Sequence, residues 1–143
     1  MVIAIAADHG GFQLKTVLKK HLAGRGFEVF DLGTDSEESV DYPEFGKACA
    51  EAVASGKAGR GIVVCGTGIG ISIAANKVKG IRCSLCTSVK MAELARKHND
   101  ANVLALGGRT TTDEEAIRIT DVWLDTEFEA GRHLRRVDKL NKM

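Results

Sequence analysis

Apolar and polar positions along this chain alternate between short apolar runs and longer segments with helical spacing. Val2–Ala7 and Ile62–Cys65 are nearly uninterrupted apolar runs, as is typical of strands that are covered on both faces. Between them, Leu14, Val17 and Leu18 recur at three- and four-residue spacing with lysines in between, which indicates an amphipathic helix. The chain therefore reads as strands that alternate with helices.

This alternation predicts an α/β fold, a three-layer Rossmann-like sandwich whose five-stranded parallel sheet has the order 2-1-3-4-5. The predicted strands are Val2–Ala7, Phe27–Asp31, Ile62–Cys65, Ile81–Cys86 and Ala101–Leu106, and the predicted helices cover 14–22, 44–55, the segment after residue 70, 89–97 and 113–124. No repeat or linker divides the chain. We expect residues 1–143 to form one domain with a C-terminal helical tail.

In a sheet of this order, the direction in which successive strands are added reverses between the first and third strands. Ligands of open α/β sheets bind beyond the carboxyl ends of the strands at that point. Asp8 and His9 follow the first strand, and Cys65 ends the third. These residues are therefore expected to flank one crevice.

Composition narrows the class of protein. The 143 residues are 44% hydrophobic and 27% charged with a net charge of +1 and no basic stripe, so nucleic acid is not an expected partner. No apolar run approaches the roughly 18 residues of a membrane span. Met1–Ile5 lacks the charged start and cleavage site of a signal peptide, so a cytoplasmic protein is expected.

The four cysteines are expected to be thiols, as in other proteins without export signals. Cys83 and Cys86 have the spacing of half a zinc site, but no second pair exists, and residues three apart on a strand point to opposite faces. No metal site is predicted there. Cys49 falls on the apolar side of its helix and is expected in the core.

A glycine loop, Gly66-Thr67-Gly68-Ile69-Gly70, joins the third strand to the next helix. Ile71 stands where a dinucleotide fingerprint needs its third glycine, and no phosphate-loop lysine follows, so nucleotide binding has little support. What remains is a cluster of N–H groups suited to a phosphate or a developing oxyanion. The simpler interpretation is a tight turn that needs glycine for its conformation only.

Cys65 comes directly before this loop. A thiol near a helix N-terminus can act as a base or a nucleophile near neutral pH. The alternative is a buried, apolar cysteine at a strand end. Asp8 and His9, at the edge where ligands bind, are candidates for substrate contact.

Three further polar residues could carry function. His98 could act as an acid or base, or simply cap the carbonyls at the end of its helix. Arg132 and Arg136 lie four residues apart and share a face if helical, which suits a phosphate clamp. A solvated basic tail is the alternative for both arginines.

Together these signals resemble the ribose-5-phosphate isomerase type B family. The resemblance covers residues 3 to about 137 and rests on Asp8-His9-Gly10-Gly11, Val40-Asp41-Tyr42-Pro43, the stretch from Cys65 to Lys77, His98-Asn99-Asp100-Ala101-Asn102-Val103 and Gly131-Arg132-His133. Galactose-6-phosphate isomerase subunits of this family generally lack the counterparts of His98 and of the Arg132-His133 motif. The chain thus looks like the pentose enzyme.

The resemblance implies interconversion of ribose 5-phosphate and ribulose 5-phosphate through an enediolate, without metal or organic cofactor. Some members carry the base as a glutamate in the helix after the glycine loop; Ala74 and Ala75 stand there in this chain, which leaves Cys65 as the base. His98, assisted by Thr67 and Asp8, would move the protons that open the sugar ring.

The resemblance also assigns the binding residues. The N–H groups of Gly66, Thr67, Gly68, Ile69 and Gly70 would hold the negative oxygen of the intermediate. Arg132 and Arg136, with His9 and Arg109, would hold the phosphate, while Asn99 and Tyr42 contact the sugar.

The direction of the chain adds one expectation. The helix before His98 runs antiparallel to the strands, so His98 should lie at the amino edge of its own sheet, opposite Cys65. A site that uses both residues would take His98 from another subunit. We therefore expect a homodimer with composite active sites, which could pair further into a tetramer.

Two other functions stay open at this point. One is a non-catalytic sugar-phosphate sensor built on the same pocket. The other is an isomerase of six-carbon phosphates such as allose 6-phosphate, which differs from the pentose enzyme in pocket length.

Overall fold

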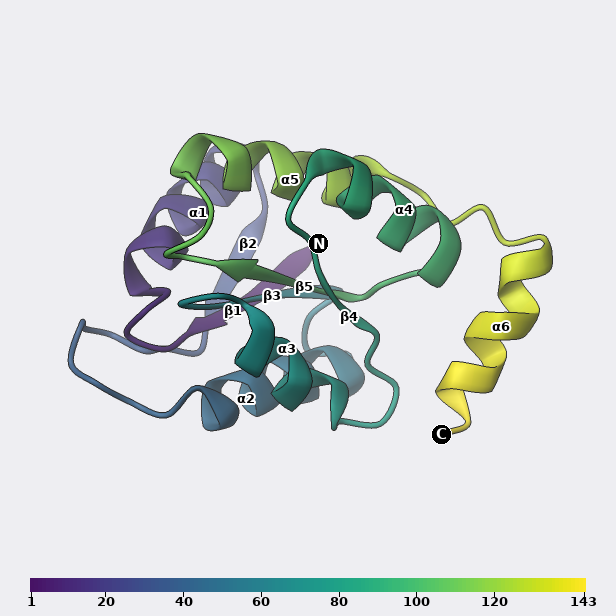
Figure 1. Cartoon of the computed structure of the whole chain (residues 1–143), viewed down its shortest axis with the longest axis horizontal. Helices are drawn as coiled ribbons and strands as arrows, with labels where there is room; N and C mark the ends of the chain where they lie inside the picture. Colours follow the sequence, from purple (N-terminus) through teal and green to yellow (C-terminus); the bar gives the residue numbers. More distant parts are fainter.

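Five strands form one parallel sheet in the computed structural model, which describes residues 1–143 (Figure 1). The strands are β1 (Val2–Ala7), β2 (Glu28–Asp31), β3 (Arg60–Cys65), β4 (Cys83–Leu85) and β5 (Val103–Gly107). The helices are α1 (Phe12–Gly24), α2 (Tyr42–Ala54), α3 (Ile69–Asn76), α4 (Val89–Asn99), α5 (Asp113–Asp125) and α6 (Arg132–Asn141). The predicted α/β class and the parallel sheet are confirmed.

The strand order is β2-β1-β3-β5-β4, so the expected order 2-1-3-4-5 is wrong for its last two strands. All five residues of β5 are buried, whereas the three residues of β4 are only half-buried. At the edge of a sheet an apolar strand would expose its side chains to water. A strand with polar positions therefore loses less free energy there than an uninterrupted apolar strand does. Arg82 and Ser84 interrupt the apolar pattern around β4 and indicate an edge strand.

Helices cover both faces of the sheet (Figure 1). On one face α1, α4 and α5 enclose a core that contains Leu18, Leu104 and Trp123. On the other face α2 and α3 enclose a second core, which contains Cys49 and Val63. The site-bearing strand ends of β1 and β3 are thus held between two apolar layers.

Cys83 packs in one of these layers and Cys86 in the other, as expected for residues three apart on a strand. Cys49 is fully buried, as predicted.

α6 lies outside the three layers, beside α4 at the end of the sheet that carries β4 (Figure 1). Only His133 and Val137 of this helix are buried. None of the helices combines the length and apolar character that a membrane crossing requires.

A buried lysine ties the end of β2 to α1. The Lys15 side chain is 2% exposed, and its Nζ donates to Asp31 Oδ1 at 2.7 Å and to the Thr34 carbonyl at 2.6 Å. Lys19 donates to the second carboxylate oxygen of Asp31 at 2.7 Å, and the Gly33 N–H donates to the first. This network holds the turn that leads from β2 to the loop over the site.

We expect Asp31 to make folding stability depend on pH. Burial acts to raise the pKa of Asp31, but the hydrogen bonds from Lys15 and Lys19 outweigh it and the pKa lies below its usual value. The stability this adds is present above the unfolded pKa, about 3.9, and is lost as pH falls through the folded pKa. Asp31→Asn should therefore lower the free energy of unfolding near neutral pH, with a smaller difference from wild type in acid.

Urea titrations across the acid range would measure this difference. Asp35→Asn is the control, because Asp35 is exposed and lies outside the network. The interpretation fails if the two variants show the same dependence on pH.

Candidate active site

Three loops meet at the carboxyl edge of the sheet, after β1, β3 and β5. The Gly108 N–H donates to the Cys65 carbonyl at 2.8 Å, and the Arg109 N–H donates to the Gly66 carbonyl at 2.9 Å. Gly108 also approaches Gly10 so closely that a Cβ on it would lie 2.5 Å from the Gly10 carbonyl oxygen. The two strand ends that the sequence predicts to share a crevice do meet.

Asp8 and His9 end β1 in fixed orientations. Asp8 is 6% exposed, and its Oδ1 accepts the N–H groups of Gly10 at 2.9 Å and Gly11 at 3.2 Å. The Val40 N–H donates to His9 Nδ1 at 3.2 Å, so the proton of a neutral His9 resides on Nε2. His9 therefore offers a hydrogen-bond donor at Nε2.

Cys65 is the last residue of β3 and lies beneath the glycine loop. It is 4% exposed, and the Gly68 N–H donates to its Sγ at 3.2 Å. The Ile69 N–H donates to Thr67 Oγ1 at 3.2 Å. Two of the N–H groups that the sequence offers to a ligand are thus engaged within the loop, one of them on the sulfur.

The first turn of α3 follows this loop. The N–H groups of Gly70 and Ile71 belong to that turn and have no acceptor within the helix. The Tyr42 ring faces the same turn, since a Cβ on Gly70 would lie 2.6 Å from the ring. Tyr42 and free backbone donors therefore lie together, next to Cys65.

A cavity of about 290 Å³ opens beside these loops. Its lining consists of His9, Gly10, Gln13, Leu14, Glu37, Gly108 and Arg109. Gln13 Nε2 donates to Glu37 Oε1, which joins α1 to the acidic loop before α2. The sequence pattern does not single out Gln13 or Glu37 as functional residues. Gln13 lies one helical turn after His9, and this spacing is the one feature of the sequence that points to it.

The structure places the remaining candidates elsewhere. Val103, which begins β5, pairs with Gly61, four residues before Cys65, so the end of α4 lies about 13 Å back along the strands at the amino edge. His98 and Asn99 lie at that end. A separate cavity of about 610 Å³, lined by Asn99 among others, opens there.

His98 and His133 stack on each other at this amino edge. Their ring centroids are 4.3 Å apart and their planes differ by 16°. Burial lowers the pKa of His133, and the neighbouring His98 and Arg132 add to this effect. The stack fixes the start of α6 against α4, and Arg132 and Arg136 on α6 are exposed.

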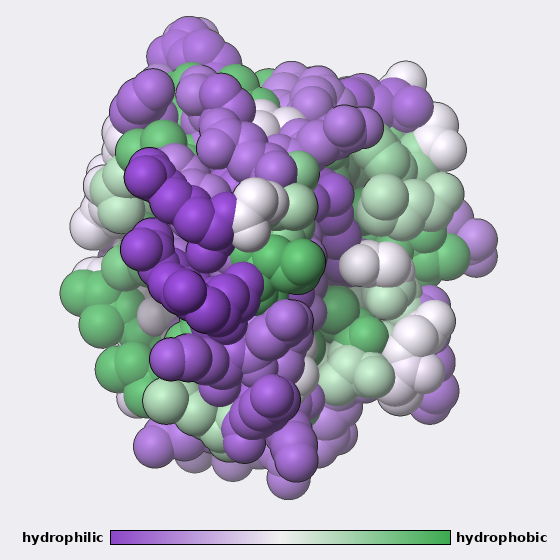
Figure 2. Space-filling view, turned by 90° about the vertical axis from the view of Figure 1, so that its right-hand side faces the viewer, coloured by the Kyte–Doolittle hydropathy of each residue, from purple (hydrophilic) through white to green (hydrophobic).

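Figure 2 shows this side of the molecule, where hydrophilic residues predominate and smaller apolar areas lie between them. Asn99, Arg132 and Arg136 are exposed and His98 is partly buried, so these four candidates form a second group at the amino edge. Within one chain, this group lies at the opposite edge of the sheet from Cys65.

Glu129 joins the two histidines in a cluster that could be considered for a metal. One ligand atom from each of Glu129, His98 and His133 lies within 4.8 Å of the others. However, nearly parallel stacked rings direct their in-plane lone pairs side by side and not toward one point. The adjacent Arg132 and Arg136 also disfavour a dication. The group is better suited to an anion.

Known proteins resemble this chain over nearly its whole length. Residues 3–140 match the family model described as Ribose/Galactose Isomerase. Ribose-5-phosphate isomerase B of Escherichia coli (strain K12) is 50% identical over 138 residues, which covers 96% of this chain and 93% of that protein.

Two solved structures are similar to this one over most of their length. Ribose-5-phosphate isomerase B of Clostridium thermocellum has a TM-score of 0.98 and 56% identity, covering 99% of this chain and 96% of the other. The Mycoplasma genitalium enzyme with bound ribulose 5-phosphate has a TM-score of 0.94 and 45% identity, covering 99% and 94%.

The thiols should differ in reactivity. Burial raises the pKa of Cys49 to about 12 and also raises the pKa values of Cys83 and Cys86, so these three stay protonated near neutral pH. The Gly68 N–H donates to Cys65 Sγ and supports a thiolate there, so iodoacetamide should label Cys65 first, as measured by mass spectrometry of the peptides. Cys65→Ser is the control, and faster labelling of any other cysteine would contradict the assignment.

Proposed function

The chain belongs to the ribose/galactose isomerase family, and on this premise we propose that it interconverts ribose 5-phosphate and ribulose 5-phosphate. The observation that carries the proposal is Cys65 beneath the glycine loop, beside the ends of β1 and β5 at the reversal point of the sheet. The bound ribulose 5-phosphate of the Mycoplasma genitalium relative supports the same substrate. A cytoplasmic location agrees with four free cysteines.

Cys65 is the base of the proposed reaction. As a thiolate it takes the proton from carbon 2 of the open-chain aldose, and the electron pair of that bond moves toward carbon 1 and its carbonyl oxygen. The result is an enediolate. A proton then passes from the oxygen on carbon 2 to the oxygen on carbon 1, and Cys65 returns its proton to carbon 1, which leaves the ketose.

The glycine loop stabilises the charge that develops during this step. The Gly68 N–H is directed at the sulfur, so it supports the thiolate before the proton is taken. The free N–H groups of Gly70 and Ile71 suit the oxygen of the enediolate, whose charge exists only once the proton leaves. Tyr42, over the same turn, contacts the sugar.

The phosphate and ring-opening groups come from two copies of the chain in this proposal. His9 and Arg109 line the cavity beside Cys65. Arg132 and Arg136, together with His98 and Asn99, lie at the opposite edge and reach this cavity only from another copy. His98, with Thr67 and Asp8 assisting, opens the ring, and a homodimer with composite sites results.

Removing the base should slow turnover strongly. Cys65→Ala is expected to lower kcat for ribose 5-phosphate by about 10²–10⁴-fold, the usual contribution of a positioned base. Cys86→Ala, at a buried thiol outside the site, is the control and should keep its activity.

The ratio of kcat/KM for ribose 5-phosphate and allose 6-phosphate separates the pentose enzyme from the six-carbon alternative. Wild-type protein that binds ribose 5-phosphate without turning it over would instead be a sugar-phosphate sensor.

Composite sites should allow complementation between inactive chains. When Cys65→Ala and His98→Ala proteins are unfolded together and refolded, each hybrid dimer contains one site with both residues intact. Activity should return to about a quarter of wild type, since about half the dimers are hybrids with one working site each. Hybrid dimers that are demonstrated by mass spectrometry and remain inactive would refute the two-copy site.

A further inference from the structure

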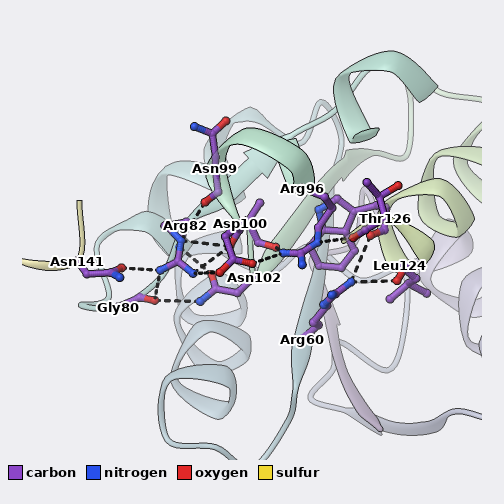
Figure 3. A network of polar contacts seen from close by, with 12 residues as sticks. Arg60, Gly80, Arg82, Arg96, Asn99, Asp100, Asn102, Leu124, Thr126 and Asn141 are labelled. Atoms are coloured by element: carbon purple, nitrogen blue, oxygen red, sulfur yellow. Dashed lines mark hydrogen bonds and ion pairs between the residues drawn. The ribbon is translucent and has the colours of Figure 1, made fainter. Parts of the chain in front are cut away.

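Asp100 and Asn102, two residues of the His98–Val103 motif, have no role in the proposed reaction but build a scaffold around Arg82 (Figure 3). The Asn102 side chain accepts the Arg82 N–H at 2.7 Å and donates to the Gly80 carbonyl at 2.9 Å. The Asn102 N–H donates to the Arg82 carbonyl at 3.0 Å. The backbone of Arg82 is therefore fixed on both sides before its side chain makes any contact.

The guanidinium of Arg82 closes the carboxyl end of α4. Its Nε donates to the Asn99 and Asp100 carbonyls, each at 3.1 Å, and its Nη2 donates to the Asp100 carbonyl at 2.9 Å. The side chain is only 14% exposed, and the Asp100 carboxylate lies 3.7 Å from it. These bonds hold the turn that directly follows His98.

The same guanidinium reaches α6. Its Nη1 donates to Asn141 Oδ1 at 2.5 Å, at the far end of α6 from the His98–His133 stack. Arg82 directly precedes β4, and this is the one hydrogen bond between α6 and any residue before Ala130. α6 is thus attached to the rest of the chain at both ends, by ring stacking at its start and by Arg82 at its end.

We propose that Arg82 is a positioning residue that holds the end of α4 and the arginine-bearing α6 in one fixed arrangement. On the proposed function, to which this inference adds, α4 presents His98 and Asn99, and α6 presents the phosphate-binding arginines to the other copy. A planar guanidinium suits this task because it donates to the α4 carbonyls and to Asn141 at the same time.

Two variants separate the two links. Asn141→Ala removes the bond to α6 and leaves the α4 carbonyl bonds intact. We expect it to raise KM for ribose 5-phosphate about fivefold, because the phosphate-binding helix is less ordered, with little change in kcat. Arg82→Lys keeps the charge but cannot donate to both helices at once, so it should also lower kcat about tenfold or more.

Arg118→Lys is the matched control, since Arg118 is exposed on α5 and pairs only with Glu115. It should leave KM and kcat at their wild-type values.

Hydrogen exchange and calorimetric binding of inorganic phosphate test the inference without turnover. Asn141→Ala should speed amide exchange in α6 alone and weaken phosphate binding, whereas Arg82→Lys should also speed exchange in the turn at 99–102. Unchanged KM, phosphate binding and α6 exchange in Asn141→Ala would overturn the inference. So would a lowered Tm as the only effect of Arg82→Lys.

A failure of the proposed function can be told apart from a failure of this inference. The proposed function fails if the wild-type protein has no isomerase activity, and in that case exchange and phosphate binding still decide the role of Arg82.

Discussion

The close backbone approach of three loops at one edge of the sheet is the constraint on which the rest of this structure depends. The loop after β5 donates hydrogen bonds to the carbonyls of Cys65 and Gly66, and it lies so close to Gly10 that Gly108 has no space for a side chain. Because the loops touch through their main chains, the Asp8 carboxylate and the Cys65 sulfur receive backbone N–H groups at defined positions. A site of this kind is rigid before substrate arrives, which is the condition for electrostatic stabilisation of a developing charge.

The opposite direction of strands and helices places the second group of candidates away from the first. α4 runs antiparallel to β5 and so delivers His98 to the amino edge, where α6 brings Arg132 and Arg136. One chain therefore carries its candidate residues in two groups at opposite edges of the sheet. On the proposed function, a second copy places its arginines beside the base of the first, and Arg82 holds the end of α4 and the arginine-bearing α6 together.

Much of the fold follows from local patterns that were legible in the sequence. All five predicted strands overlap the observed ones, and Thr112 caps α5 by accepting the Glu115 N–H at 3.2 Å. The error in strand order has a local cause as well. The predicted order 2-1-3-4-5 places consecutive strands side by side, whereas Arg82 and Ser84 indicate that β4 belongs at the edge.

The sequence by itself determined the class of fold, the family and the residue types of the candidate site, because periodicity and short motifs depend on neighbours along the chain. The tertiary structure decided how those residues are used. The bond from Val40 that sets the His9 proton, the stack of His98 on His133 and the link from Arg82 to Asn141 join residues 31, 35 and 59 positions apart. No local pattern reports such contacts, since they exist only after the sheet and its helical layers have packed.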